Sequence, residues 1–180
     1  MDAISIMRGL ARNNAWANHR LLAACAQLSP DELHATRTSF FPTIMKTLNH
    51  ILTVDWFYVD ALVGGGRGRS AYAIEEPYAE LAPLRAAQLA SDRTLLAFVE
   101  GLAPAQLDAE VELDRRVGRL LDTAGAVLLH MLEHSIHHRG QVHAMLAGTR
   151  VAPPQLDEYF LREDLPVRRH ELVELELEIG

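Results

Sequence analysis

Apolar residues recur at a spacing of three or four along most of the chain, which is the pattern of helices that bury one face. The first such stretch runs from about Ile4 to Leu28, and Ser29-Pro30-Asp31 follows it with residues that break or cap helices. A second runs from about Pro42, a typical first-turn residue, to Val63, where the glycines Gly64 to Gly66 stop it. Both stretches predict helices.

The second half of the chain repeats this pattern after a short interruption. A third helix is predicted from about Glu80 to Glu100 and a fourth from about Asp122 to Leu146, each with a glycine close behind it. Between them, Ala109 to Asp114 alternates apolar and acidic residues, which predicts a brief strand, and Arg115 to Arg119 predicts a turn. The fold class expected is all-α, an up-down-type four-helix bundle with minor β pieces.

The C-terminal region gives a weaker pattern. Residues Gln155 to Arg162 suggest a short extra helix. From Glu171 to Ile179, Leu or Val alternates with Glu in period two, which favours an edge strand. We therefore expect a single domain over residues 1–180, with a tail from about residue 166 to which the sequence assigns no role.

Composition narrows the class of protein. A chain of 180 residues that is 49% hydrophobic can bury one good core. Its formal net charge of -7, with no face rich in Lys or Arg, argues against nucleic-acid binding. No basic and apolar leader and no apolar run of membrane-spanning length is evident, so a cytoplasmic protein without a membrane partner is expected. Cys25 is the one cysteine, which excludes an internal disulfide and every zinc site built on paired thiolates.

Histidines are concentrated in the fourth predicted helix, where residues 130–143 hold five of the nine in the chain. On a helical wheel His134 and His138 lie within the apolar face, on neighbouring turns, near enough to share one ion. Among histidines outside the fourth helix, His50 on the second helix is the best third ligand, because His19 is on an outer face, His34 is in a loop and His170 is in the tail. Three histidines without cysteine leave a coordination position open, which is typical of a catalytic metal site.

Two other interpretations of the histidine pair stay open on this evidence. Buried neutral histidines can simply be satisfied by hydrogen bonds to other helices. Several histidines can also form a pH switch that charges together below about pH 6.5. The ligand spacing and the further histidines nearby favour the metal.

Polar residues also interrupt the apolar stripes elsewhere. Asn14 and Asn18 share a side of the first helix with leucines, so they are expected either to bridge helices or to point into a cleft. Asp55 lies in the stripe of the second helix and needs a cation or a donor. We expect an ion pair between Arg139 and Asp55 that places His50, with Asp157 as the alternative partner of Arg139.

The whole chain resembles the DinB family of four-helix metalloproteins, which includes bacillithiol transferases and, more distantly, mycothiol-dependent maleylpyruvate isomerases. The resemblance depends on Asn14-Ala15-Trp16-Ala17-Asn18, on Thr47 to Leu52, on His134 to Val142 and on the stretch Gly148 to Asp157. The tail after Pro166 does not match the family pattern. The resemblance implies helix-packed homodimers and a metal bound by one histidine of the second helix and the pair of the fourth.

That ligand set maps onto His50, His134 and His138, the residues that the wheel also selects. The resemblance implies a thiol-dependent S-transferase, in which a divalent ion, with zinc or nickel expected, activates a low-molecular-weight thiol that attacks an electrophilic small molecule. His137, Gln141 and His130 flank the ion and are candidates for relaying protons or orienting its ligands.

Two other functions remain as alternatives. One is a non-catalytic helical dimer of a stress response, whose metal is structural or absent. The other is a metal-dependent hydrolase that uses water in place of the thiol. Covalent catalysis by the protein is not expected, because no Ser-His-Asp or Cys-His arrangement is evident and Cys25 has no base beside it.

Overall fold

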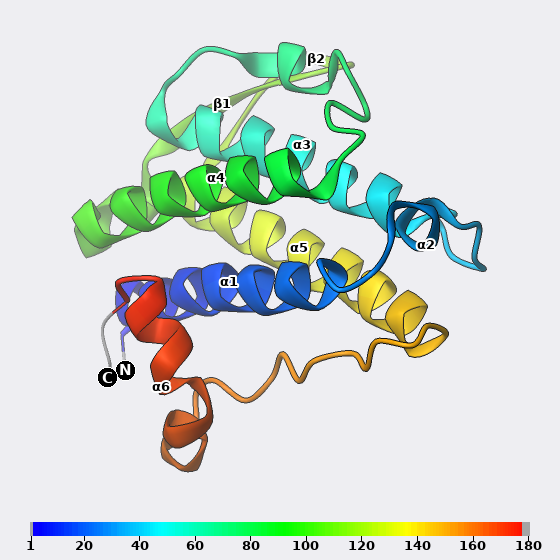
Figure 1. The fold of residues 1–180 in the computed structure, drawn as a ribbon. Coiled ribbons are helices and arrows are strands. Elements are labelled where there is room, and N and C mark those ends of the chain that lie inside the picture. The colour runs from blue at the N-terminus through cyan, green and yellow to red at the C-terminus, as the bar shows by residue number, and fades with distance from the viewer. Residues whose placement is uncertain (1, 178–180) are drawn as a thin grey trace.

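Four long helices form a bundle in the computed structural model, which describes residues 2–177 (Figure 1). They are α1 (Ala3–Cys25), α3 (Ile44–Val63), α4 (Leu81–Gly101) and α5 (Ala124–Ala147). Helix α1 packs on α4 and α5, and α3 packs on the same two helices, so α1 and α3 lie diagonally across the bundle. In Figure 1 the colours show that α1 and α5 run in one direction and α3 and α4 in the other. The expected all-α bundle is confirmed.

Short elements connect these helices. A two-residue turn joins the antiparallel strands β1 and β2, which pair from Glu110 with Thr123 to Arg115 with Gly118. The first strand confirms the brief strand expected from the alternating residues. The short elements are α2 (Pro30–His34), η1 (Gly68–Tyr72), η2 (Pro104–Asp108), β1 (Glu110–Arg115), β2 (Gly118–Thr123), η3 (Arg162–Asp164) and α6 (Leu165–Glu174).

Threonine caps set the starts of the two histidine-bearing helices. The Thr43 hydroxyl accepts a hydrogen bond of 3.0 Å from the backbone N–H of Lys46 at the start of α3. The Thr123 hydroxyl accepts one of 3.2 Å from the N–H of Ala126 at the start of α5. Such caps satisfy donors that the first turn of a helix leaves free. They fix where α3 and α5 begin, and therefore where along each helix its histidines fall.

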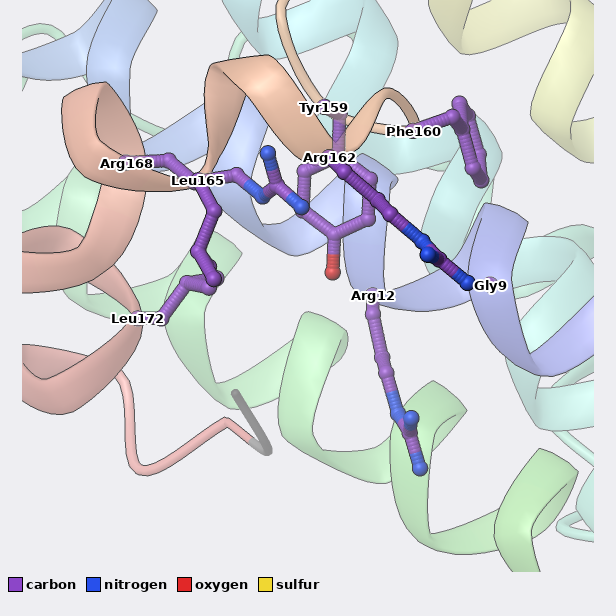
Figure 2. A pocket seen from close by; sticks show the side chains of 8 residues that line it. All are labelled: Gly9, Arg12, Tyr159, Phe160, Arg162, Leu165, Arg168 and Leu172. Carbon is purple, nitrogen blue, oxygen red and sulfur yellow. The ribbon is translucent and has the colours of Figure 1, made fainter. Parts of the chain in front are cut away.

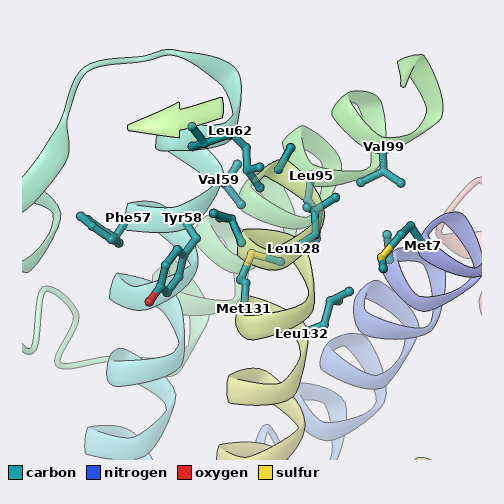
Figure 3. Packing of buried hydrophobic residues seen from close by; sticks show 14 of the residues in the cluster. Met7, Phe57, Tyr58, Val59, Leu62, Leu95, Val99, Leu128, Met131 and Leu132 are labelled. Atoms are coloured by element: carbon teal, nitrogen blue, oxygen red, sulfur yellow. The ribbon is translucent and has the colours of Figure 1, made fainter. Parts of the chain in front are cut away.

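The apolar core is divided into two clusters along the bundle axis. One cluster fills the end near the β strands, where side chains from all four long helices meet (Figure 3). Met7, Tyr58, Leu95 and Met131 belong to it. The second fills the opposite end and contains residues such as Leu21, Ile44, Leu52, Leu84 and Leu146. Between them the four helices contribute buried polar residues, so the middle of the bundle is a polar layer.

Two predictions for the C-terminal region are wrong. Residues 155–161 are not helical, and the extra helix is α6, which includes residues 171–174 of the expected strand. Pro166 lies in the first turn of α6, where its fixed φ suits a helix. Leu172 packs against Trp16 of α1, and the Glu171 carboxylate accepts hydrogen bonds of 2.7 Å from Trp16 Nε1 and 2.8 Å from Arg20 Nε. These contacts with α1 explain why the segment is helical; Ile179 lies outside the described residues.

Among residues 2–177, no helix is both long enough and apolar enough to cross a lipid bilayer.

Candidate metal centre

Three histidines converge where α3 packs on α5. His50 comes from α3, and His134 and His138 come from neighbouring turns of α5. One candidate ligand nitrogen from each ring lies within 4.8 Å of the other two, and Nε2 of His50 is 3.0 Å from Nε2 of His134. The structure thus brings together the three residues that the sequence selects as ligands.

Gln141 orients one member of the cluster. Its carboxamide oxygen lies 2.8 Å from His138 Nδ1 and accepts a hydrogen bond from it, while its Nε2 lies 3.1 Å from His137 Nε2. A proton on Nδ1 leaves the Nε2 lone pair of His138 free to bind a cation. Gln141 and His137 therefore lie directly beside the candidate ligands, linked to His138 by hydrogen bonds.

The ionisation state of the cluster suits a metal. Burial, followed by the effects of the neighbouring His138 and His50, lowers the pKa of His134 to about 3. Burial, followed by the effect of His138, lowers the pKa of His50 to about 4. The pKa of His138 is also lowered, mainly by burial. All three imidazoles are therefore neutral at neutral pH, which is the form that binds a metal.

The spacing of the ring nitrogens gives a further test of whether the cluster fits a metal ion. In a tetrahedral site with metal–nitrogen distances of about 2.0–2.1 Å, ligand nitrogens lie about 3.3 Å apart. The His50 and His134 nitrogens lie 3.0 Å apart and no pair of candidate ligand atoms is more than 4.8 Å apart, so small side-chain adjustments reach that value. His134 Nδ1 is buried without a hydrogen-bond partner among the described residues. An ion bound at Nε2 does not reach this atom, because the two nitrogens of an imidazole point in different directions, so Nδ1 stays unpaired at a cost of about 1–3 kcal/mol.

An aromatic ring, that of Phe41, lies against one side of the cluster and only partly shields it from solvent. The Phe41 ring lies 4.4 Å from the His50 ring and 5.7 Å from the His138 ring, measured between centroids. Phe41, His50 and His134 are only half-buried, and the adjacent Phe40 is 78% exposed. The histidines beside Phe41, a residue for which the sequence gave no signal, are therefore partly accessible to solvent.

His130 lies outside the group of converging ligands. It is exposed, and its ring packs 5.2 Å from the Tyr58 ring of α3. It acts on the cluster at a distance, since it is one of the smaller causes of the lowered pKa of His134. Tyr58 in turn accepts a hydrogen bond from Arg115, so His130 borders a polar flank one turn away from the candidate ligands.

The polar layer beside the histidines is a continuous hydrogen-bond network. Arg139 donates to the amide oxygens of Asn14 and Asn18, the second at 2.9 Å. The amide nitrogens of these residues donate to Asp92 Oδ1, at 3.3 Å from Asn14 and 2.9 Å from Asn18. Asn14 and Asn18 are therefore bridges between helices, the first of the two expected roles, and they connect the side chains of Arg139 and Asp92.

The expected ion pair between Arg139 and Asp55 is not a direct contact. Asp55 instead accepts hydrogen bonds of 2.7 Å from Gln88 Nε2 and 3.0 Å from the Ser135 hydroxyl. Arg139 influences Asp55 only through space, where its charge opposes the effect of burial, which raises the pKa of Asp55 to about 6. No ion pair with the alternative partner, Asp157, is present among the described residues either.

Sequence reasoning missed Gln88 and Asp92 on α4. Both are buried in the stripe that also carries Leu84, Leu95 and Val99. Their spacing of four in an otherwise apolar stripe is the signal that could have revealed them, as it did for Asn14 and Asn18 on α1. Gln88 joins the two acids, because its Nε2 also lies 3.3 Å from Asp92 Oδ1.

Cys25 is unsuited to nucleophilic chemistry. It is fully buried in the apolar cluster at the end of the bundle opposite the β strands, and burial raises its pKa to about 12. A thiol with so high a pKa holds almost no thiolate at neutral pH.

Comparison with known proteins supports the resemblance. Residues 6–165 match the DinB family. A curated relative, Protein DinB of Bacillus subtilis (strain 168), is 25% identical over 155 residues, which cover 81% of this chain and 88% of the relative. The match includes all three histidines and ends where α6 begins, so the C-terminal helix lies outside the part that the family describes.

Proposed function

The chain belongs to the DinB family, and on that basis we propose that it is a metal-dependent enzyme that transfers a low-molecular-weight thiol to an electrophilic small molecule. His50, His134 and His138 hold the ion in this proposal. The observation that carries it is their convergence as three neutral imidazoles with an approach left open beside Phe41. Zinc or nickel is the ion expected, because imidazole nitrogen suits both.

A divalent ion held by His50, His134 and His138 would keep its positive charge, because all three ligands are neutral, and would supply the charge that lowers the pKa of a thiol toward neutral pH. The thiol loses its proton, its sulfur forms a bond to an electrophilic carbon, and the leaving group departs with the bonding electrons. In this proposal the exposed His137 takes up the released proton at Nε2, giving up the hydrogen bond that Gln141 Nε2 donates there, and passes it to solvent. Gln141 holds the His138 ring and its tautomer during the reaction.

Phe41 supplies the apolar wall of this site. Because its ring lies against His50 and His138, it shields one side of the cluster from water and offers a surface to the apolar part of a substrate. A homodimer in the cytoplasm is part of the same proposal, and light scattering of the purified protein measures the number of chains in the assembly.

The test is a thiol-dependent assay on protein purified without a histidine tag. We expect monochlorobimane to be consumed in the presence of glutathione, bacillithiol or mycothiol, and the rate to fall after chelation and recover with added zinc or nickel. His50→Ala lowers the rate by more than the roughly 10–100-fold that changes beside a metal ligand cost. His143→Ala is the matched control, because His143 lies on α5 outside the cluster.

Two results would contradict the transferase. Protein that binds metal but consumes no electrophile with any of the three thiols points to the non-catalytic dimer. Cleavage of ester or amide substrates that depends on the metal but not on a thiol points to the hydrolase.

A further inference from the structure

A pocket lies away from the histidines, between the first half of α1 and the C-terminal segment (Figure 2). Its volume is about 540 Å³, within the range of about 300–1,000 Å³ typical of small-molecule sites. None of its lining residues belongs to the histidine cluster or to the polar layer. The lining residues are Gly9, Arg12, Tyr159, Phe160, Arg162, Leu165, Arg168 and Leu172.

The charged residues of this lining are all positive. It contains three arginines and no Asp or Glu, in a chain whose formal net charge is -7. Glu100 holds one of them, Arg12, at 2.7 Å. Arg162 and Arg168 form no ion pair within the described part of the chain. Two cations are therefore left without an anion around one cavity.

Arg168 is the more unusual of the two, because it is only 7% exposed. Its Nη1 donates a hydrogen bond of 3.1 Å to the carbonyl oxygen of Leu161, and its guanidinium lies 5.2 Å from the centre of the Tyr159 ring. Its Nε is buried with no hydrogen-bond partner among the described residues. A buried cation is costly unless an anion or several acceptors compensate it. The described part of the fold provides no such anion for Arg168, so a bound anion would compensate its charge.

Tyr159 adds a neutral donor between the arginines. In Figure 2 its ring lies between Arg162 and Arg168, and its hydroxyl points toward α1. The hydroxyl forms no hydrogen bond within residues 2–177, although the side chain is 8% exposed. Burial raises the pKa of Tyr159, so the hydroxyl stays protonated and can donate to an anion.

The rest of the lining is apolar. Phe160, Leu165 and Leu172 provide the hydrophobic surface, and Phe160 is 56% exposed. Gly9 allows Phe160 to lie against α1, because a Cβ at this position would come within 3.2 Å of Phe160 Cε1. The pocket therefore combines a cationic end with an apolar wall.

We propose that this pocket binds a small organic carboxylate with an apolar body, such as an aliphatic acid. Arg162, Arg168 and the Tyr159 hydroxyl hold the carboxylate, since guanidinium and phenol groups are all donors and guanidinium pairs with carboxylate in a two-bond fork. Phe160, Leu165 and Leu172 contact the apolar body. The site is built by α6 and the segment before it, which gives this C-terminal region a role separate from the metal chemistry.

Titration calorimetry of the full chain with octanoate tests this proposal. We expect saturable binding of one octanoate per chain. Arg162→Gln, which removes an exposed charge, weakens it about tenfold, the effect of losing one charge-assisted contact. Arg168→Gln weakens it at least as much, and a melting curve shows whether that variant is folded. Arg116→Gln is the matched control and leaves the affinity unchanged, because Arg116 is an exposed arginine of the β turn outside this pocket.

Two further probes separate the contribution of the charge from that of the apolar chain. Octan-1-ol, which has the chain but no charge, and inorganic phosphate, which has charge but no chain, should each bind at least about tenfold more weakly than octanoate. Absence of saturable octanoate binding would overturn the proposal. Equal affinity for octanol, equal affinity for phosphate, or unchanged octanoate affinity in Arg162→Gln would overturn it as well.

Discussion

Two groups of polar side chains lie next to each other inside this bundle, and they differ in how completely they are satisfied. In the polar layer, Arg139 and Asp92 are connected through amide side chains, and Asp55 has two donors. In the histidine cluster, two Nε2 atoms face each other and His134 Nδ1 has no partner. Buried polar groups with complete hydrogen bonding stabilise and specify a fold, whereas an incomplete set is expected where a ligand binds.

Helix α5 joins the two groups residue by residue. Ser135 of the polar layer follows His134, and Arg139 follows His138. Because successive side chains of a helix point about 100° apart, one helix can turn its histidines to α3 and the adjacent residues to the bundle centre. The polar layer thereby fixes the rotation of α5 and the direction of the candidate ligands.

The polar layer balances its charge with one proton. It holds two carboxyl groups, Asp55 and Asp92, and a single cation, Arg139. Burial, and then the charge of Asp55, raises the pKa of Asp92 to about 8. At neutral pH we therefore expect Asp92 to be largely protonated, with Asp55 and Arg139 charged. The histidine cluster differs, because its three members are neutral bases and no acidic group among them supplies a proton or a charge.

The largest expected effect comes from removing the cation of the polar layer. Arg139→Met leaves Asp55 without its countercharge and two amides without their donor, so the free energy of unfolding should fall by about 3–5 kcal/mol. Urea denaturation measures it. Arg93→Met, at an exposed position of the helix that carries Asp92, is the control and should change stability by less than about 0.5 kcal/mol. A variant as stable as the original protein would show that the layer does not hold the helices together.

A smaller effect is expected at the boundary of the histidine cluster. Gln141→Leu removes the acceptor that holds His138 Nδ1, so metal affinity should fall about 10–100-fold while the fold is kept. Competition with a chromophoric chelator measures the affinity. Unchanged affinity would mean that His138 is positioned by packing alone.

The pH dependence of stability distinguishes the two groups further. The folded pKa of Asp92 lies near 8 and its unfolded value near 3.8, so between them the folded state holds a proton that the unfolded state has lost. Stability therefore falls as pH rises through this window, by at most about 1.4 kcal/mol per pH unit. The buried histidines, neutral when folded and partly protonated when unfolded, add a slope of opposite sign near pH 7, so the Asp92 slope is taken as the difference between metal-free original protein and Asp92→Asn from about pH 7 to 8. Asp92→Asn should remove it; a slope of equal size in the variant would assign it to another group.

The sequence predicted the four long helices and the candidate ligands because both depend on local periodicity. His134 and His138 are four residues apart on an apolar face, and His50 lies on the flank of the apolar stripe of a second helix. Their convergence therefore needed only that these two helices pack together. The partner of Arg139 was not predictable in the same way. Choosing between Asp55 and the amides of Asn14 and Asn18 requires the rotation of three helices about their axes, which the sequence pattern gives only coarsely.

The C-terminal region shows the opposite case, in which local pattern misled. The alternation of leucine and glutamate from residue 171 is typical of a strand, but the described structure offers it no neighbouring strand, and tertiary contacts decided otherwise. Glu171 and Leu172 are buried against Trp16 as parts of α6. Pro166 was a local signal for the start of that helix.

The metal content of the protein tests the central claim most directly. Protein purified without a tag, loaded with zinc or nickel and dialysed, should retain about one ion per chain by mass spectrometry, as one three-histidine site requires. His138→Ala should retain almost none and remain folded. Absence of bound metal in the original protein, or equal metal in His138→Ala, would contradict the assignment of His50, His134 and His138 as a metal centre.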